Sequence, residues 1–253
     1  MNLSIIRTLK DLPAISLQEM DKASLMDRID NKYIFPVKDL TNLLNEVKND
    51  YFIFEINDKR ISHYSTLYYD TQKLDLYHSH HSGKLNRYKV REREYTDSGI
   101  CFFEIKFKNN KKLTIKRRIP VHSINNKIEG ITSEFLKETS NLDAEDLSPT
   151  LWVDYDRITL VSKTLDERVT FDLNLTFSFD GKEEKITDLI TIEAKRTKQT
   201  KSTPVIKYLK QNSIREGGFS KYCLGMASIY NELKANNFKK KFLKIDKTRR
   251  TYV

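Results

Sequence analysis

Lys and Arg side chains recur at every second position in three successive runs between residues 84 and 118. Neighbouring side chains of a β-strand point to opposite faces, so each run predicts a strand with cations on one face and apolar residues on the other. The alternating cations are Arg87, Lys89, Arg91 and Arg93 in the first run, Lys106 and Lys108 in the second, and Lys116 and Arg118 in the third. Such a face is typical of a polyanion site, because an anion offsets the repulsion between the cations.

This segment carries most of the excess positive charge of the chain. Residues 84–118 contain twelve Lys or Arg and four Asp or Glu, which leaves a balance of +8, against +10 for all 253 residues. Two interpretations are open at this point. The cations form an ordinary solvated sheet face, or they bind an acidic partner such as a phosphorylated metabolite, a nucleic acid or an anionic membrane.

Carboxylates occupy the same alternating rows, at Asp30, Glu104, Asp172 and Glu193. A nucleic-acid face needs few carboxylates, whereas a phosphoryl-transfer site uses them to hold a divalent metal while cations neutralise phosphate oxygens. The mixture favours phosphoryl transfer with Mn²⁺ or Mg²⁺, which take oxygen ligands. For each acid the alternative is a salt bridge to a neighbouring cation. For Glu193 we favour the metal role, with Asp172 and Glu104 as second choices.

Several other kinds of site are not indicated. The sequence has no G-x-x-x-x-G-K-[ST] or G-x-G-x-x-G loop, so a nucleotide would not be held by a Gly-rich loop. No Ser/His/Asp or Cys/His nucleophilic arrangement can be inferred. His78, His80 and His81 fall in a segment that we expect to be an exposed loop, with a metal site as the alternative.

Composition indicates a folded chain in a reducing compartment. The 13 Tyr and 13 Phe argue against disorder, and the two cysteines, Cys101 and Cys223, form neither a disulfide framework nor a zinc-site spacing. The first residues lack the apolar core of a signal peptide, and no apolar run approaches the roughly 20 residues of a membrane span. We therefore expect a cytoplasmic chain. Residues 1–236 are expected to form one domain, and residues 237–253 a basic tail that is solvated and mobile, with a membrane or polyanion contact as the alternative.

Periodicity predicts the elements that position these residues. Helices are expected over residues 15–26, 37–47, 133–139, 204–213 and 221–234, the last with Ser220 as its N-cap. About eight main strands, including those over residues 62–70, 151–161, 168–175 and 188–196, have one apolar and one charged face. Eight antiparallel strands can close into a barrel. We predict a mainly β fold with flanking helices (α+β), an eight-stranded antiparallel barrel whose charged rows line a central tunnel.

Nine short motifs occur in the order found in the VTC (vacuolar transporter chaperone) domain, and over residues 24–229 the chain resembles that family of triphosphate tunnel metalloenzymes. The motifs are SLMDRIDNKYIFP, STLYYDT, YKVREREY, FFEIKFK, KRRIP, VDYDRITL, ERVTFDLNL, TIEAKR and FSKYCLGM.

The resemblance implies a tunnel that binds a nucleoside triphosphate by its phosphates. In the VTC family it also implies transfer of the terminal phosphate of ATP onto a growing polyphosphate chain, with Mn²⁺ or Mg²⁺. Matched by motif, the catalytic cations are expected to be Arg91, Arg93, Lys106, Arg157 and Arg168. Further phosphate contacts are expected from Lys32, Lys116, Arg118, Tyr155, Ser220 and Lys221, to which the charged rows add Lys89, Lys108 and Lys195. Asp172 accompanies them, and Glu193 resembles the metal ligand.

Two departures from related proteins bear on the expected reaction. The wider superfamily often has Glu-x-Glu-x-Lys in its first strand, where this chain has Arg28, Asp30 and Lys32, which weakens a simple triphosphatase assignment. Eukaryotic relatives add a regulatory domain and membrane helices, so we expect this chain to need a separate membrane protein for any polymer transport. The surplus of cations favours a polymerase that brings two polyanions together, with no nucleic-acid partner. A metal-dependent triphosphatase and a non-catalytic polyphosphate or nucleic-acid binding module are the alternatives.

Overall fold

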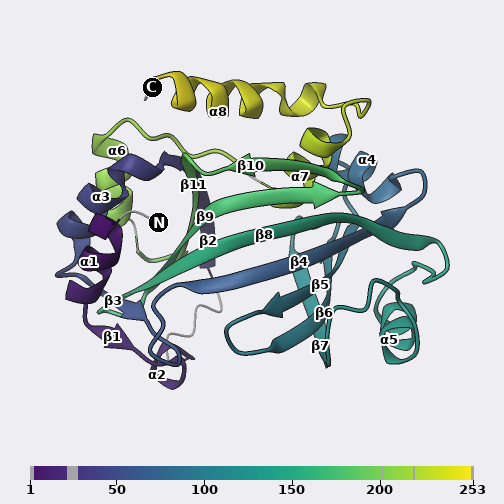
Figure 1. Ribbon diagram of the computed structural model, residues 1–253, viewed down its shortest axis with the longest axis horizontal. Helices are drawn as coiled ribbons and strands as arrows, with labels where there is room; N and C mark the ends of the chain where they lie inside the picture. The colour runs from purple at the N-terminus through teal and green to yellow at the C-terminus, as the bar shows by residue number, and fades with distance from the viewer. Residues whose placement is uncertain (1–2, 22–27, 201, 219, 252–253) are drawn as a thin grey trace.

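The computed structural model describes residues 3–21, 28–200, 202–218 and 220–251. One large, strongly curved sheet runs through the molecule, and helices cover parts of both of its faces (Figure 1). The prediction of a mainly antiparallel β fold with flanking helices is therefore confirmed. In the described part of the chain, no helix is both long and apolar enough to span a bilayer.

The main path of the sheet contains eight strands, and all its pairings are antiparallel. Their order across the sheet is β2, β11, β9, β8, β4, β5, β6 and β7. In sequence order their bounds are β2 Arg28–Pro36, β4 Ser62–Thr71, β5 Arg87–Tyr95, β6 Ile100–Lys108, β7 Thr114–Val121, β8 Leu147–Ser162, β9 Glu167–Phe179 and β11 Leu189–Thr197.

The predicted closure of these strands into a barrel is wrong for the described residues, because no hydrogen-bonded pairing joins the edge strands β2 and β7. Both edges carry cations on the concave side, Lys32 on β2 and Lys116 and Arg118 on β7. Bringing them together without an anion would be repulsive. Side-chain alternation reports which face each residue takes, but it does not report whether the outer strands meet.

Three short strands lie off this path. β1 (Ala14–Ile15) pairs in parallel with β3 (Tyr51–Phe54), which pairs with β8, and β10 (Lys182–Ile186) forms a hairpin with β9. The hairpin turns at Gly181, whose φ of +73° favours glycine. These strands extend the sheet to eleven without changing the order of its main path.

Helices on the convex face bury the apolar side of the sheet. α1 (Leu3–Asp11), α3 (Leu40–Val47) and α6 (Pro204–Gln211) pack in one cluster against β9, β11 and neighbouring strands, and α5 (Ile131–Thr139) packs over β6 and β7. α6 begins as expected, with Pro204 at its first turn and the Thr203 hydroxyl accepting a hydrogen bond from the Ile206 amide.

The concave face changes from charged to apolar along β9. The sequence pattern predicts that Leu175 shares the convex face with Leu173, but Leu173 joins the convex cluster and Leu175 joins a second cluster on the other side. The register with β8 shifts here, and Asn174 adopts a φ of +50°. This β-bulge reverses the side-chain alternation, an effect that the pattern alone did not reveal.

α7 (Lys221–Ile229) covers the apolar end of the concave face. The helix approaches the sheet closely at Gly225, where a Cβ atom would lie 2.5 Å from Phe177 and 2.7 Å from Leu151. Only glycine fits at this contact without displacing a side chain. α7 therefore covers the apolar end of the concave face. The charged end of this face begins at the first turn of α7 and stays uncovered by that helix.

The segment predicted to be a basic tail is largely helical over its described residues. After the 3₁₀ helix η2 (Asn236–Phe238), α8 (Lys239–Thr251) runs along the top of Figure 1 and contacts β2 and β11. Ile245 is 3% exposed and joins the α7 cluster together with Phe238. Tertiary contacts at two apolar residues thus hold a segment that its high charge had marked as solvated.

Two other segments differ from expectation or fall partly outside the described residues. Of the helix predicted over residues 15–26, α2 covers Leu17–Asp21, and residues 22–26 lie outside the described part of the chain. The three histidines lie in α4 (Asp75–His81) rather than in a loop. The helix predicted over residues 37–47 begins as a 3₁₀ turn, η1 (Val37–Asp39), before α3.

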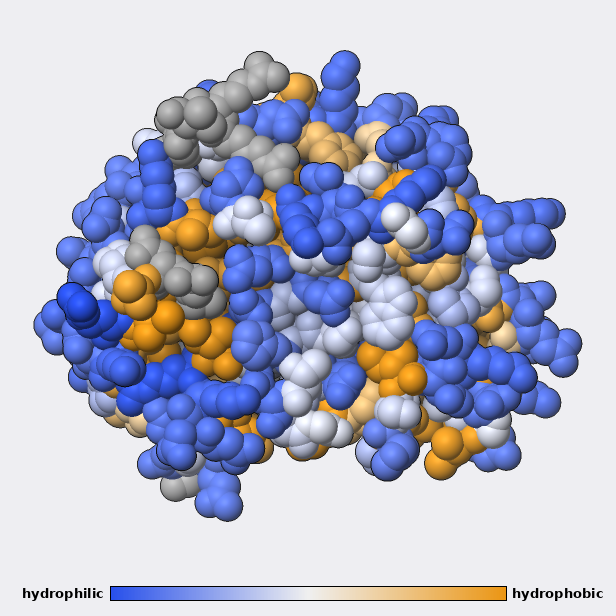
Figure 2. All heavy atoms as spheres, in the orientation of Figure 1, coloured by the Kyte–Doolittle hydropathy of each residue, from blue (hydrophilic) through white to orange (hydrophobic). Residues whose placement is uncertain are grey.

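Hydrophilic side chains dominate the rim of the molecule in Figure 2, with apolar residues visible between them.

Candidate functional site

Strand register brings the predicted cations onto one concave face. Across β5, β6 and β7, Arg91 pairs with Glu104 and Glu104 with Arg118, while Lys89 pairs with Lys106 and Lys106 with Lys116. Across β8, β9, β11 and β2, Arg157 pairs with Asp172, Arg168 with Lys195, and Glu193 with Lys32. Residues predicted from separate strands therefore form one continuous charged surface, which we call the cationic face.

Asp172 is the counter-ion of two cations at the centre of this face. Arg157 donates from Nε and Nη2 to the carboxylate at 2.6 and 2.9 Å, and the Lys221 ammonium contacts the same group. The Asp172 side chain is only 3% exposed. Burial by itself would raise the pKa of Asp172, but Arg157 and Lys221 hold this pKa well below its usual range.

Glu104 plays the same part between β5 and β7. It lies fully buried and forms ion pairs with Arg91 and Lys116, which lower its pKa against the effect of burial. Arg91 also donates from Nη1 to the Tyr68 hydroxyl at 3.0 Å. Burial, together with the neighbouring cations Arg91 and Arg118, lowers the pKa of Lys116 to about 8 despite its pairing with Glu104.

Glu193 is held more loosely than the other two acids. Lys32 and Lys195 lie 3.5 and 3.4 Å from its oxygens, beyond ordinary charged hydrogen bonds, and its side chain is 24% exposed. Burial would raise the pKa of Glu193, but Lys195 and Lys32 lower it to about 2. Its oxygens are therefore ionised and the most accessible of the three predicted metal ligands. Within the described residues, no three His, Cys, Asp or Glu side chains group to hold a metal on their own.

Two buried donors on the cationic face, Arg93 and the Tyr155 hydroxyl, lack an acceptor that would neutralise or satisfy them among the described residues, and Lys106 on the same face is half-buried. Arg93 is 8% exposed and donates only to the Thr66 hydroxyl, at 3.2 Å, with no described carboxylate within salt-bridge distance. The Tyr155 hydroxyl is buried, and no hydrogen-bond partner for it lies in the part of the chain that the structure describes. Arg91, with burial and Arg93, moves the pKa of Lys106 well below its usual value. Each of these groups would be stabilised by an anion.

The start of α7 adds further polar groups to the same face. Ser220 is the N-cap, as predicted, and its hydroxyl accepts from the Cys223 amide at 3.3 Å. Lys89 donates to this hydroxyl at 2.9 Å. The first turn of α7 is also held by Asp70, because the Tyr222 hydroxyl donates to this buried carboxylate. The same carboxylate accepts from the α4 amides of Leu76 and Tyr77. Asp70 thereby orders both α4 and α7, which explains why the histidine segment is helical.

Not every predicted residue lies at the centre. Lys108 pairs with Arg87 at the end of β6 near α4, whereas Arg168 pairs with Lys195 and Val161 toward the opposite end of the face. Arg118 is exposed on edge strand β7, with its guanidinium carbon 4.1 Å from the centre of the Phe102 ring.

Sequence reasoning missed the contribution of β4. Tyr64, Thr66 and Tyr68 alternate along this strand and face the cations, with Tyr68 contacting Arg91 and Thr66 contacting Arg93. The signal was the same two-residue alternation, but hydroxyl and aromatic residues do not stand out as charged ones do. Burial would raise the pKa of Tyr68, yet Arg91, Arg93 and Lys89 together lower it.

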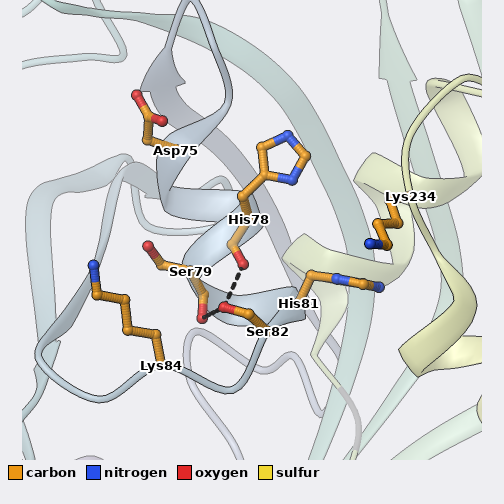
Figure 3. Close-up of a pocket in the computed structure, with 7 residues that line it drawn as sticks. All are labelled: Asp75, His78, Ser79, His81, Ser82, Lys84 and Lys234. Carbon is orange, nitrogen blue, oxygen red and sulfur yellow. Dashed lines mark hydrogen bonds between the residues drawn. The ribbon is translucent and has the colours of Figure 1, made fainter.

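The histidine segment borders this face at His80. Burial and Lys89 lower the pKa of His80 to about 3, and its ring contacts the Tyr88 carbonyl and Arg87. A surface pocket of about 580 Å³ lies beside α4 (Figure 3), where Ser82 donates to the His78 carbonyl at 2.9 Å. Its lining contains none of the predicted site residues, so it is separate from the cationic face.

The fold and this face together define a curved antiparallel sheet that presents buried, uncompensated cations to an anionic ligand. Comparison with protein families agrees with that class: residues 27–230 match the VTC domain. The chain belongs to the VTC domain family, within the triphosphate tunnel enzymes, which are generally metal-dependent. No curated protein matches the chain by sequence.

A solved structure from Hippeastrum shares the fold at low sequence identity. A Hippeastrum protein, described as a candidate adenylyl cyclase with a dominant triphosphatase activity, is 13% identical, with a TM-score of 0.51, and the match covers 80% of this chain and 96% of that one. A candidate adenylate cyclase from Vibrio parahaemolyticus is 14% identical, with a TM-score of 0.47 and coverage of 78% and 97%.

Proposed function

We propose that this protein is a polyphosphate polymerase that transfers the terminal phosphate of ATP onto a growing polyphosphate chain. The observation that carries the proposal is the uncompensated charge of the cationic face. Among the described residues, thirteen cations, counting Lys221, stand on or beside it against the four carboxylates Asp30, Glu104, Asp172 and Glu193. The excess exceeds what one triphosphate would neutralise, and a polymerase must hold a second polyanion beside the first.

In the proposed reaction the chain acts mainly by binding and orienting phosphates. Arg93 and the Tyr155 hydroxyl would donate to phosphate oxygens, since among the described residues Arg93 meets a hydroxyl but no carboxylate and the Tyr155 hydroxyl has no hydrogen-bond partner. Lys106, which pairs with Lys89 and Lys116 across the strands, would add a third donor. Arg91 and Arg157 are fixed in place by carboxylates and so present rigid, preorganised charge as negative charge spreads over the transferring group.

The residues present fit a divalent metal at one position. Glu193 has an ionised carboxylate with only long contacts to Lys32 and Lys195, so it would hold Mn²⁺ or Mg²⁺ together with phosphate oxygens and water. When bound, such a metal supplies charge neutralisation of the phosphate oxygens. Asp172 and Glu104 are each engaged by two cations at hydrogen-bonding distance, which makes them counter-ions in preference to metal ligands.

A triphosphatase is the second candidate, favoured by the fold shared with the Hippeastrum protein described as having that activity. Both reactions use the same phosphate cradle and differ in whether water or a phosphate chain end reaches the terminal phosphorus. The exposed Asp30 carboxylate on β2 forms an ion pair with Arg28 at 3.0 Å and lies away from the buried acids Glu104 and Asp172. A non-catalytic polyanion-binding module would use the same cations without turnover. We also propose a cytoplasmic location, with any polymer transport left to a separate membrane protein.

The test is incubation of the pure protein with ATP and Mn²⁺, with and without a short polyphosphate primer. Products are separated on a gel stained for polyphosphate, and free phosphate is measured in parallel. A ladder of longer chains is expected. Release of phosphate without a ladder would replace the polymerase by the triphosphatase, and binding without either product would leave the non-catalytic module.

A further inference from the structure

Four aromatic side chains form a row across the cationic face, which runs from Tyr155, beside Lys221 of α7, toward the edge strand β7. Tyr155, Tyr64, Tyr95 and Phe102 come from the adjacent strands β8, β4, β5 and β6. Ring centres are 5.0 Å apart for Tyr64 and Tyr155, 4.9 Å for Tyr64 and Tyr95, and 6.0 Å for Tyr95 and Phe102. Tyr155 and Tyr64 also pack in the apolar cluster beneath α7, whereas Tyr95 and Phe102 belong to none of the apolar clusters, so burial of the core does not explain the position of these outer two rings.

The two halves of the row differ in how much of their ring surface already contacts other side chains. Tyr64 and Tyr155 stack on each other at an interplanar angle of 5°, and the Arg157 guanidinium lies 4.9 Å from the centre of Tyr64. Tyr95 and Phe102 are half-buried, near sheet-edge strand β7, and meet edge to face at 81°. Arg118, itself exposed, lies over the Phe102 ring. The second half therefore presents ring and guanidinium surfaces close to solvent.

We infer that Tyr95, Phe102 and Arg118 form a stacking platform for the nucleobase of a nucleoside triphosphate. Flat heteroaromatic bases stack on aromatic rings and guanidinium planes with little dependence on sequence or base identity. This inference rests on the proposed function, because it places the nucleoside of a ligand whose phosphates lie on Arg93 and Lys106.

The polarity of the bound ligand follows from the two ends of the face. At one end α7 covers apolar residues, with the Tyr222 ring 5.0 Å from Tyr68. At the other end the platform lies four residues from Lys106 along β6, a separation of about 13 Å. The phosphate chain is thus directed toward α7 and the base toward the platform.

A simpler role for the rings is to hold the arginines in place, since Arg93 lies 5.5 Å from the centre of Tyr64. The two roles predict different ligand dependence. Loss of a base platform weakens binding of nucleotides alone, whereas misplaced arginines weaken binding of every phosphate ligand.

The experiment compares two ligands, a β,γ-imido analogue of ATP and inorganic tripolyphosphate, by calorimetry in the presence of EDTA. The variant carries Tyr95→Leu and Phe102→Leu. The matched control is Phe107→Leu, which removes a half-buried ring from the same strand but from the convex face, where it stacks on Tyr88 at 4.6 Å.

In the double variant we expect the Kd of the ATP analogue to rise about tenfold, within the range of base–aromatic stacking. The Kd of tripolyphosphate should change less than about twofold, and its retention also shows that the site is folded. Phe107→Leu should alter neither the Kd of the ATP analogue nor the Kd of tripolyphosphate. An equal loss for both ligands, or an unchanged Kd for the ATP analogue, overturns the platform alone. Failure of the wild-type protein to bind tripolyphosphate overturns the proposed function and the platform with it.

Discussion

Replacing Asp172 by Asn separates the role of a counter-ion from that of a phosphate or metal ligand. The substitution keeps the shape of the side chain and removes a charge that is 3% exposed and shared by Arg157 and Lys221. Removing one partner of a buried ion pair typically costs about 3–5 kcal/mol, because the remaining charge is left desolvated. An amide oxygen can still accept one hydrogen bond from Arg157, so we expect the lower end of that range.

Although Asp172→Asn should lower the stability of the protein, it should strengthen the binding of phosphate ligands. Arg157 and Lys221 lose their counter-ion and become available to phosphate oxygens, so tripolyphosphate should bind the Asp172→Asn variant more tightly. A ligand stabilises the folded state by RT ln(1 + [L]/Kd), so the stability gap between wild type and variant should narrow as tripolyphosphate is added.

The assay is urea unfolding of both proteins with and without tripolyphosphate. Glu183→Gln serves as the control, because it breaks an exposed pair with Lys185 that is worth at most about 1 kcal/mol. A loss of less than about 1 kcal/mol in Asp172→Asn, or a gap that stays constant with ligand, would refute the counter-ion reasoning.

Three further predictions follow from other parts of the structure. Arg93→Ala should leave the unfolding free energy nearly unchanged but abolish tripolyphosphate binding in calorimetry. Arg117→Ala, on the opposite face of β7, should change neither the unfolding free energy nor tripolyphosphate binding. Glu193→Gln should lower metal-dependent turnover at least about 10²-fold, or about 3 kcal/mol in barrier, and wild-type turnover would reassign the metal ligand. Burial raises the pKa of Glu167 to about 7 from its usual 4.5, so stability should fall by about 3 kcal/mol as the pH rises from 4.5 through 7. Urea unfolding at pH 5 and pH 8 should show this step in the wild type and not in Glu167→Gln.

Local sequence determined the elements and the facing of most site residues. Alternation is a property of neighbouring positions in one strand, so the cations of β5, β6 and β7 could be assigned to one face without knowing the pairing. Helix starts followed for the same reason. Ser220 and Thr203 cap the helices that immediately follow them, through contacts three residues away.

Tertiary structure decided which of these charges are free. Arg91 and Arg93 are equivalent in the sequence pattern, yet only Arg91 meets a carboxylate, because the β5–β6 register places Glu104 opposite Arg91 and Phe102 opposite Arg93. Likewise Asp172 meets Lys221, 49 residues away, only because α7 returns to the sheet. Contacts of this kind depend on strand register and chain path, which no local pattern records.

The same distinction explains the expectations that proved wrong. The bulge at Asn174, the helix containing His81 and the seating of Ile245 each depend on a partner distant in sequence, respectively β8, Asp70 and the α7 cluster. Closure of the sheet depends on whether its edge strands β2 and β7 meet, which no alternation within a single strand records. Sequence alternation set the chemistry of the concave face, and long-range packing set its curvature, its covered end and its uncompensated donors, because those properties arise only when separate segments meet.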